Sequence, residues 1–156
     1  MNRIAVIQIR GGIGIKETIK TTLNLLRLYK KNSCIIINET PSFMGMLNSL
    51  KDQVTWGEID KETFRLLLEK RGRLPGNMLI TEEYLKKSLN LSFDQFAEQF
   101  LANKKELKDI PGLKQFFRLT PPIKGFENKG TKKPFSMGGA LGYRKDNIND
   151  LIRRML

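Results

Sequence analysis

Residues 3–38 read RIAVIQIRGGIGIKETIKTTLNLLRLYKKNSCIIIN, and this stretch decides the fold. Its first part, 3–9, is rich in β-branched residues and predicts a strand. A glycine turn at 10–14 follows, after which apolar residues recur with helical spacing from Ile15 to about Tyr29. Residues 33–38 are largely apolar and predict a second strand. We therefore expect strand, turn, helix and strand in close succession.

The following segment repeats this order. Thr40 is a good N-cap and Pro41 suits the first helical position, which predicts a helix that extends to about Lys51. Residues 54–59 predict a third strand. The first 59 residues thus have the pattern β-α-β-α-β, and strands joined only by helices favour parallel pairing.

The middle of the chain, 60–110, has the pattern of several helices. Asp60 can cap a helix to about Arg71, and Thr81 can start another to about residue 89. Ser92 with Gln95 forms a capping box for a third helix to about residue 103. The phenylalanines at 93, 96 and 100 share one face of that helix, so we expect them in the core, with base stacking as the alternative.

Residues 118–145 predict a basic arm. A short strand at 116–119 precedes it, and a final helix over 146–155 follows it. Large apolar residues are sparse in the arm and turn-forming residues are dense, so we expect no packed core there. Six lysines or arginines lie between residues 124 and 145, with Glu127 as the one acid before Asp146. Such an arm, with interleaved aromatic residues, suits ordering between RNA helices; a solvated flexible loop is the alternative.

Charge is concentrated at the two ends of the chain. The formal net charge is +12. Residues 1–45 carry 7 basic and 2 acidic side chains, residues 46–117 carry 12 and 11, and residues 118–156 carry 9 and 3. Self-repulsion of this kind costs stability unless a polyanion neutralises it. The commonest intracellular polyanion is nucleic acid, so we expect an RNA-binding protein.

The composition excludes several classes of protein. The sequence has no histidine and one cysteine, Cys34, so it cannot build a disulfide framework, a zinc site of the usual type or a histidine-based catalytic centre. We expect no cofactor and no metal. No apolar run approaches the ~20 residues that span a bilayer, and the N-terminus lacks a signal-peptide pattern. We expect a cytoplasmic protein with no membrane partner.

The glycine turn at 10–14 lies between a strand and a helix, as phosphate-binding loops do. It fits neither nucleotide-binding pattern, because the Walker spacing is absent and Glu17 stands where a dinucleotide loop has its third glycine. Three interpretations stay open: a tight turn, a nucleotide site of an enzyme, and a site for one phosphate of an RNA backbone.

Three sets of residues, in order along the chain, resemble the large-subunit ribosomal protein L-thirty family, whose eukaryotic counterpart is called L-seven. They are IRGGIG (9–14) with Thr22-Leu23 and Leu26-Arg27-Leu28; NETPSFMGMLN (38–48); and FRLTPP (117–122), GGALGYR (138–144) and INDLIRRM (148–155). The last set resembles the C-terminal extension of the archaeal and eukaryotic forms. Because the chain lacks the long basic N-terminal arm of the eukaryotic form, it is most similar to the long archaeal form.

The resemblance implies an α+β fold with a core domain at 1–59 related to the ferredoxin-like architecture. In that core an antiparallel three-stranded sheet, with the first strand central, packs on two helices. Residues 60–156 form the extension, made of helices at 60–110, the basic arm at 118–145 and the C-terminal helix at 146–155. Antiparallel pairing here replaces the parallel pairing that the pattern alone favours.

The resemblance also implies a structural constituent of the large ribosomal subunit and no enzyme. Its partners would be large-subunit rRNA and neighbouring ribosomal proteins, with one copy per ribosome and a role in translation and ribosome assembly. A non-ribosomal RNA chaperone and a protein-interaction module that uses the neutral middle are the alternatives.

We expect the RNA contacts to come from basic residues of the core and the arm and from the glycine turn. The expected contact residues are Arg3, Arg10, Gly12, Lys16, Lys20, Arg27, Lys30, Lys31, Lys51, Arg118, Lys124, Lys129, Lys132, Lys133, Arg144 and Lys145.

Overall fold

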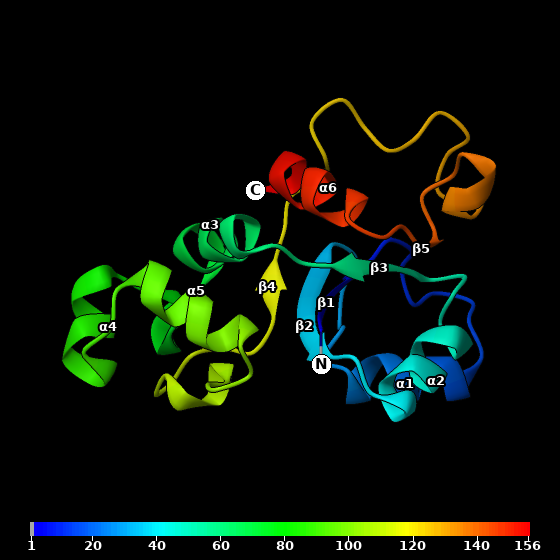
Figure 1. The fold of residues 1–156 in the computed structure, drawn as a ribbon. Helices are drawn as coiled ribbons and strands as arrows, with labels where there is room; N and C mark the ends of the chain where they lie inside the picture. Colours follow the sequence, from blue (N-terminus) through cyan, green and yellow to red (C-terminus); the bar gives the residue numbers. More distant parts are fainter. Residues whose placement is uncertain (1) are drawn as a thin grey trace.

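A computed structural model describes residues 2–156, in which strands and helices alternate up to α3 and further helices and two short strands follow (Figure 1). The elements are β1 (Arg3–Gln8), α1 (Glu17–Leu25), β2 (Ser33–Asn38), α2 (Pro41–Ser49), β3 (Val54–Glu58), α3 (Lys61–Arg71), α4 (Glu82–Leu89), α5 (Phe93–Leu101), β4 (Phe117–Arg118), β5 (Gly142–Tyr143) and α6 (Asn147–Met155). The predicted β-α-β-α-β start and the later helices are confirmed.

The strands form one five-stranded sheet in the order β4-β2-β1-β3-β5. β1 is antiparallel to both neighbours, with Ala5 opposite Ile36 on β2 and opposite Gly57 on β3. The expectation of an antiparallel core with a central first strand is therefore confirmed, and the parallel pairing favoured by the pattern is wrong for these three strands. β2 and β3 do run in the same direction, but β1 lies between them, because the α2 crossover skips one position in the sheet.

The sheet is larger than the three strands expected. β4 pairs antiparallel with the start of β2, and β5 pairs parallel with β3, so the later part of the chain adds one short strand to each edge. These short edge strands pair with main-chain groups of β2 and β3 that would otherwise be exposed at the edges of the sheet.

Both faces of the sheet are covered, which explains why β1 is buried along its whole length. Ile4 and Val6 pack in a cluster with residues of α1 and α2. Ala5 and Ile7 point to the opposite face and pack in a second cluster with residues of α3, α5 and α6. Figure 1 shows the two groups of helices on opposite sides of the sheet. The core of residues 1–59 is therefore completed by residues from 60–156.

Local capping sets most helix starts as predicted. Thr40 accepts a hydrogen bond from the amide of Phe43, and Pro41 is the first helical residue. Asp60 caps α3, and Ser92 with Gln95 forms the capping box of α5. The first helix is shorter than predicted, because Arg27 adopts a left-handed φ of 59° and the chain turns there towards β2.

The phenylalanines of α5 belong to the core, as predicted. Phe96 and Phe100 are buried, and the Phe100 ring stacks on Phe64 of α3 with ring centroids 4.3 Å apart. Stacked aromatic rings hold these two helices together, so the rings are occupied by the fold and are not exposed to nucleic acid.

The expectation that residues 118–145 have no packed core is wrong. Leu119, Ala140 and Leu141 are buried in the cluster on the α6 side of the sheet. Main-chain hydrogen bonds also fold the arm onto itself, among them Lys129 N to Gly138 O at 3.2 Å and Ala140 N to Gly130 O at 3.1 Å. The turn-forming residues therefore build a folded loop, because a few apolar side chains at its ends reach the main core.

Candidate nucleic-acid interface

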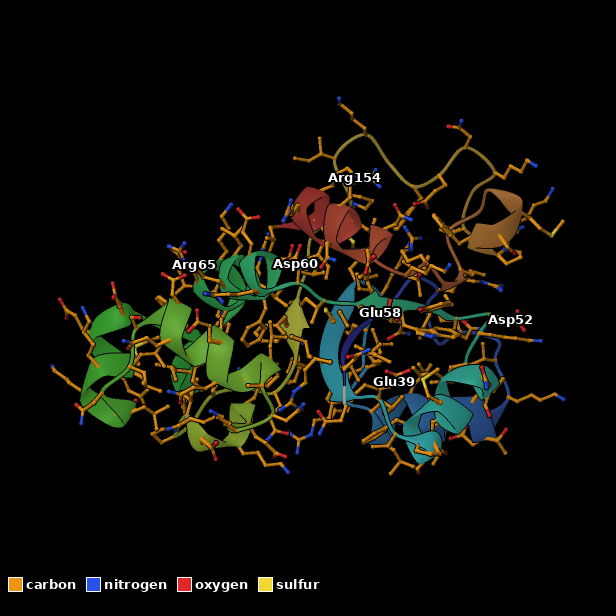
Figure 2. All side chains as sticks on the ribbon, viewed as in Figure 1. Glu39, Asp52, Glu58, Asp60, Arg65 and Arg154 are labelled. Atoms are coloured by element: carbon orange, nitrogen blue, oxygen red, sulfur yellow. The ribbon has the colours of Figure 1, made fainter. Side chains whose placement is uncertain are left out.

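Exposed cations gather at one end of the sheet. At one end, where β1 finishes and β2 and β3 begin, the chain places basic side chains that lie far apart in sequence. They are Arg10, Lys30, Lys31, Lys51 and Arg118, and all are exposed. We call this the basic end. At the other end lie Glu39, Glu58 and Asp60 (Figure 2).

Hydrogen bonds between the loops hold the basic end together. The amides of Ile9 and Arg10 both donate to Gln53 O, and the amide of Asn32 donates to Gln8 O at 2.8 Å. The amide of Leu119 donates to Asn32 O at 2.9 Å, which brings β4 beside the loop that carries Lys30 and Lys31. The antiparallel pairing of β1 with both neighbours gathers these loops, and like charges gathered in this way raise the local potential for an anion.

Fourteen of the sixteen expected contact residues are exposed. Besides the five residues of the basic end, they include Lys16, Lys20 and Arg27 near α1 and Lys124, Lys129, Lys132, Lys133 and Lys145 of the arm, together with Gly12. Lys20 is the member of this set that forms an ion pair, with Glu17 at 3.8 Å, among residues 2–156. The structure thus leaves most of these cations available for phosphate.

Arg3 is buried, and its selection as an RNA contact needs correction. Nε donates to Phe100 O at 3.1 Å and Nη2 donates to Lys105 O at 3.0 Å, with the guanidinium 4.0 Å from the centre of the Phe100 ring. Burial lowers the pKa of Arg3, and the charge of Glu106 opposes that shift. The charge of Arg3 therefore serves to join β1 to the loop after α5.

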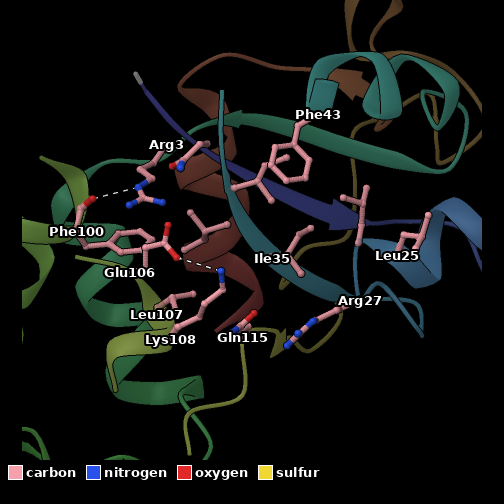
Figure 3. A pocket seen from close by; sticks show the side chains of 14 residues that line it. Arg3, Leu25, Arg27, Ile35, Phe43, Phe100, Glu106, Leu107, Lys108 and Gln115 are labelled. Carbon is pink, nitrogen blue, oxygen red and sulfur yellow. Dashed lines mark hydrogen bonds and ion pairs between the residues drawn. The ribbon is translucent and has the colours of Figure 1, made fainter. Parts of the chain in front are cut away.

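A cavity of about 240 Å³ lies beside β2. Figure 3 shows Arg3 on one side of this cavity and Arg27 on the opposite side. Apolar side chains such as Ile35, Phe43 and Leu107 form much of its wall. Of the cations in the wall, Lys108 pairs with Glu106 at 3.3 Å and Arg3 donates to main-chain oxygens.

Arg144 is also buried and is not available for RNA. Its Nη1 lies 2.6 Å from Oε1 of Glu127, its Nε donates to Thr55 Oγ1, and its Nη2 donates to Ala140 O. The guanidinium also lies 4.8 Å from the centre of the Phe135 ring. The one acid of the arm is thus used inside the fold, where a buried cation needs a partner.

The aromatic residues of the arm are engaged by the protein as well. Phe126 packs against the core, Phe135 lies beside Arg144, and the hydroxyl of Tyr143 donates to Glu58. That hydrogen bond is the main cause that raises the pKa of Tyr143 to about 12. The interleaved aromatic pattern therefore has a structural explanation.

The geometry of the glycine turn gives direct support to one of its three interpretations, the tight turn. Ile13 in this turn is 99% exposed, and helix α1 begins only at Glu17, whose carboxylate lies in the first turn. A negative charge at that position competes with an anion for the helix N-terminus. Gly14 has a φ of 73°, which a glycine adopts without strain, so the tight-turn interpretation has direct geometric support.

Basic residues that the sequence pattern did not single out lie next to Arg118. Arg71, Arg73 and Lys114 line a second cavity with it, together with Asn77 and Phe116. The pair Arg71 and Arg73 at the end of α3 could have indicated this basic site. Because the surrounding segment has balanced charge, the two arginines were instead consistent with cations that stabilise a helix C-terminus.

Comparison with known proteins decides the family. A model of the family described as ribosomal protein L30p/L7e matches residues 4–54. Large ribosomal subunit protein uL30 of Methanococcus maripaludis strain C5 is 46% identical over 152 residues, which cover 97% of this chain and 98% of that protein. The chain belongs to this family.

Other uL30 proteins match over nearly the whole chain. The protein of Methanopyrus kandleri is 46% identical over 94% of this chain and 99% of its own length. That of Nanoarchaeum equitans is 45% identical over 97% of both chains. The resemblance to a long archaeal L30 form is thereby confirmed. As a homologue of uL30, this chain is a structural protein and not an enzyme.

Within residues 2–156, histidine, cysteine and carboxylate side chains nowhere gather in a group of three that could hold a metal ion. None of the helices in this described part is both long and apolar enough to cross a membrane.

Proposed function

We propose that this chain is a constituent of the large ribosomal subunit and stabilises large-subunit rRNA by binding its phosphates. The observation that carries this proposal is the gathering of exposed cations from separate loops at one end of the sheet. Arg10, Lys30, Lys31 and Lys51 come from three different loops, yet they lie at one end with Arg118. Membership of the L30 family supplies the class of RNA.

The proposed interface has two parts. The basic end and the neighbouring face of α1 form the first part: Arg10, Gly12, Lys16, Lys20, Arg27, Lys30, Lys31, Lys51 and Arg118. The arm forms the second part: Lys124, Lys129, Lys132, Lys133 and Lys145. Arg3 and Arg144 are withdrawn from the set because the fold uses their charges.

The proposed mechanism is static. Cations on a folded scaffold release counterions from the RNA, which favours binding and makes it depend on salt. Because the arm is already folded, less backbone entropy is lost on binding than a disordered arm would lose, at about 1–2 kcal/mol per residue. Recognition of RNA shape follows from contacts that are mainly to phosphate and sugar.

The proposed partners are large-subunit rRNA and the ribosomal proteins beside it, with one copy of the chain per particle. We keep 1–59 and 60–156 as proposed core and extension, although the apolar cluster on one face of the sheet draws on both.

Sedimentation of large subunits tests the proposal. The tagged protein, expressed in the organism from which it comes, should sediment with large ribosomal subunits and remain bound to them through a high-salt wash. An RNA chaperone should be removed by that wash. Protein that is found only in the wash fractions would contradict a structural role.

A further inference from the structure

A cavity of about 390 Å³ lies beside β4, and its charged walls are all basic. It is lined by Arg71, Arg73, Asn77, Lys114, Phe116 and Arg118. Four of these six side chains carry a positive charge at neutral pH and none is acidic. Cavities of roughly 300 Å³ and above are the size at which proteins hold small ligands.

The fold brings these cations together from three segments. Arg71 is the last residue of α3, and Arg73 pairs with Leu79 in an isolated β-bridge. The amide of Lys114 donates to Arg73 O at 3.0 Å, which places the segment leading into β4 against this bridge. Arg118 follows on β4 itself. Convergence of like charges costs stability unless an anion compensates it.

The positive charge of the cavity is not balanced by acidic side chains. Among residues 2–156, no carboxylate side chain forms an ion pair with any of the four cations within 4.0 Å. Arg71 donates to an oxygen of Leu156, the last residue of the sequence, and to Thr120 Oγ1, and Arg73 donates to Asn77 O. The Nε of Arg71 is buried and has no hydrogen-bond partner. Donors therefore remain unused at this site.

An aromatic pair completes the site. The ring of Phe116 lines the cavity and meets the ring of Tyr29 edge to face, with centroids 5.8 Å apart. Tyr29 is 54% exposed, and Lys30 and Lys31 follow it directly. The cavity thus adjoins the basic end through both Tyr29 and Arg118.

We propose that this cavity binds one nucleotide of large-subunit rRNA, with its phosphate among the four cations and its base against Phe116. Arginine donates to phosphate in a fork, and unstacked RNA bases commonly pack on aromatic rings. This inference rests on the proposed function and adds a defined nucleotide site to it. None of Arg71, Arg73, Lys114 and Phe116 belongs to the interface described above.

The phosphate half is tested by the double variant Arg73→Ala/Lys114→Ala in the full-length protein, because both residues line the cavity and neither belongs to the interface described above. Binding to refolded large-subunit rRNA is measured at several salt concentrations. The log–log slope should fall by about 1–2, because the slope counts phosphates that the protein neutralises. Lys87→Ala/Lys104→Ala is the matched control, since both lysines are exposed, lie outside the cavity and form no ion pair within the described chain. It should leave the slope nearly unchanged.

The base half is tested by Phe116→Leu, which keeps an apolar side chain but removes the aromatic face. Affinity should fall about five-fold to a hundred-fold at every salt concentration, because base stacking is largely insensitive to salt. The slope should stay at the wild-type value. Circular dichroism and thermal unfolding show whether each variant is folded; a misfolded Phe116→Leu is replaced by Phe116→Met.

The outcomes separate this inference from the proposed function. Wild-type protein that fails to bind large-subunit rRNA contradicts the proposed function. Wild-type binding combined with a cavity double variant that behaves like its control overturns the nucleotide site alone. Unchanged affinity of the folded Phe116 variant overturns the packing of a base in the cavity.

Discussion

Arg144 and Glu127 form an ion pair in which the arginine is shut off from solvent. Nη1 and Oε1 lie 2.6 Å apart, and the two side chains are 1% and 19% exposed. Further hydrogen bonds from Arg144 reach Thr55 and Ala140, so the pair connects the arm to β3 and to the segment before β5. This pair explains how a glycine-rich, basic segment keeps one conformation.

Glu127→Gln should destabilise the protein by about 3 kcal/mol. The substitution leaves the buried Arg144 without a compensating charge, and the loss of one partner of a buried pair is strongly unfavourable. Urea unfolding at pH 7 measures the change. The exposed Glu69, which has no ion pair within residues 2–156, supplies the control Glu69→Gln, expected within about 0.5 kcal/mol of the wild type.

The same variant should loosen the arm. Trypsin should cut Glu127→Gln after Lys129 and Lys132 faster than it cuts the wild type, because these lysines lie in the segment that Arg144 anchors. Equal cleavage rates in the two proteins would show that the ion pair does not hold the arm.

Replacement of Lys129, Lys132 and Lys133 together with alanine should reduce the log–log salt slope of rRNA binding by about 2–3. All three side chains are exposed, and none forms an ion pair among residues 2–156. Lys86, Lys87 and Lys104 replaced together remove the same charge around α4 and α5, away from the arm (Figure 1). If the arm variant and this control give the same slope, the arm lies outside the interface.

Stability should decrease above pH 9 because of Cys34. Complete burial raises the pKa of this thiol from 9.0 to about 12, so the folded protein keeps the proton that the unfolded chain loses. Stability is therefore full below pH 9 and falls by up to about 1.4 kcal/mol per pH unit between pH 9 and pH 12. Unfolding of the wild type and of Cys34→Ala at pH 8.5, 9.5 and 10.5 measures this contribution.

Cys34→Ala should show a shallower decline over that range, since both proteins share the other titrating groups, including Tyr143. Parallel profiles for the two proteins would exclude the thiol as the cause.

Gly57→Ala should destabilise the protein by about 3 kcal/mol. A Cβ at this position of β3 would lie 2.0 Å from the main-chain oxygen of Lys145, so β3 and the start of α6 would have to separate. Gly45→Ala is the control, because the space around Gly45 is open and α2 gains from a better helix former, by about 1 kcal/mol or less. The denaturation midpoints of the two variants are compared, and that of Gly57→Ala should be clearly lower. Equal midpoints would contradict the close contact between Gly57 and Lys145.

The sequence by itself determined the local elements. Thr40, Asp60 and Ser92 begin their helices in the structure as their caps predict, and β2 spans the predicted residues. Caps and strand patterns depend on hydrogen bonds and side-chain alternation within a few residues, so they can be recognised without knowledge of the fold. Family resemblance added the antiparallel pairing, which the local pattern did not indicate.

Tertiary structure alone decided which charges are free. Arg3 and Arg144 look like other arginines in the sequence, yet their partners come from Phe100 and Glu127, which only the folded chain places beside them. Likewise, Arg73 and Arg118 meet at one cavity although 45 positions separate them, because β4 returns to the edge of β2. Charge counts sum over a segment, whereas solvation and partners depend on three-dimensional neighbours, so the interface could be predicted by region but not residue by residue.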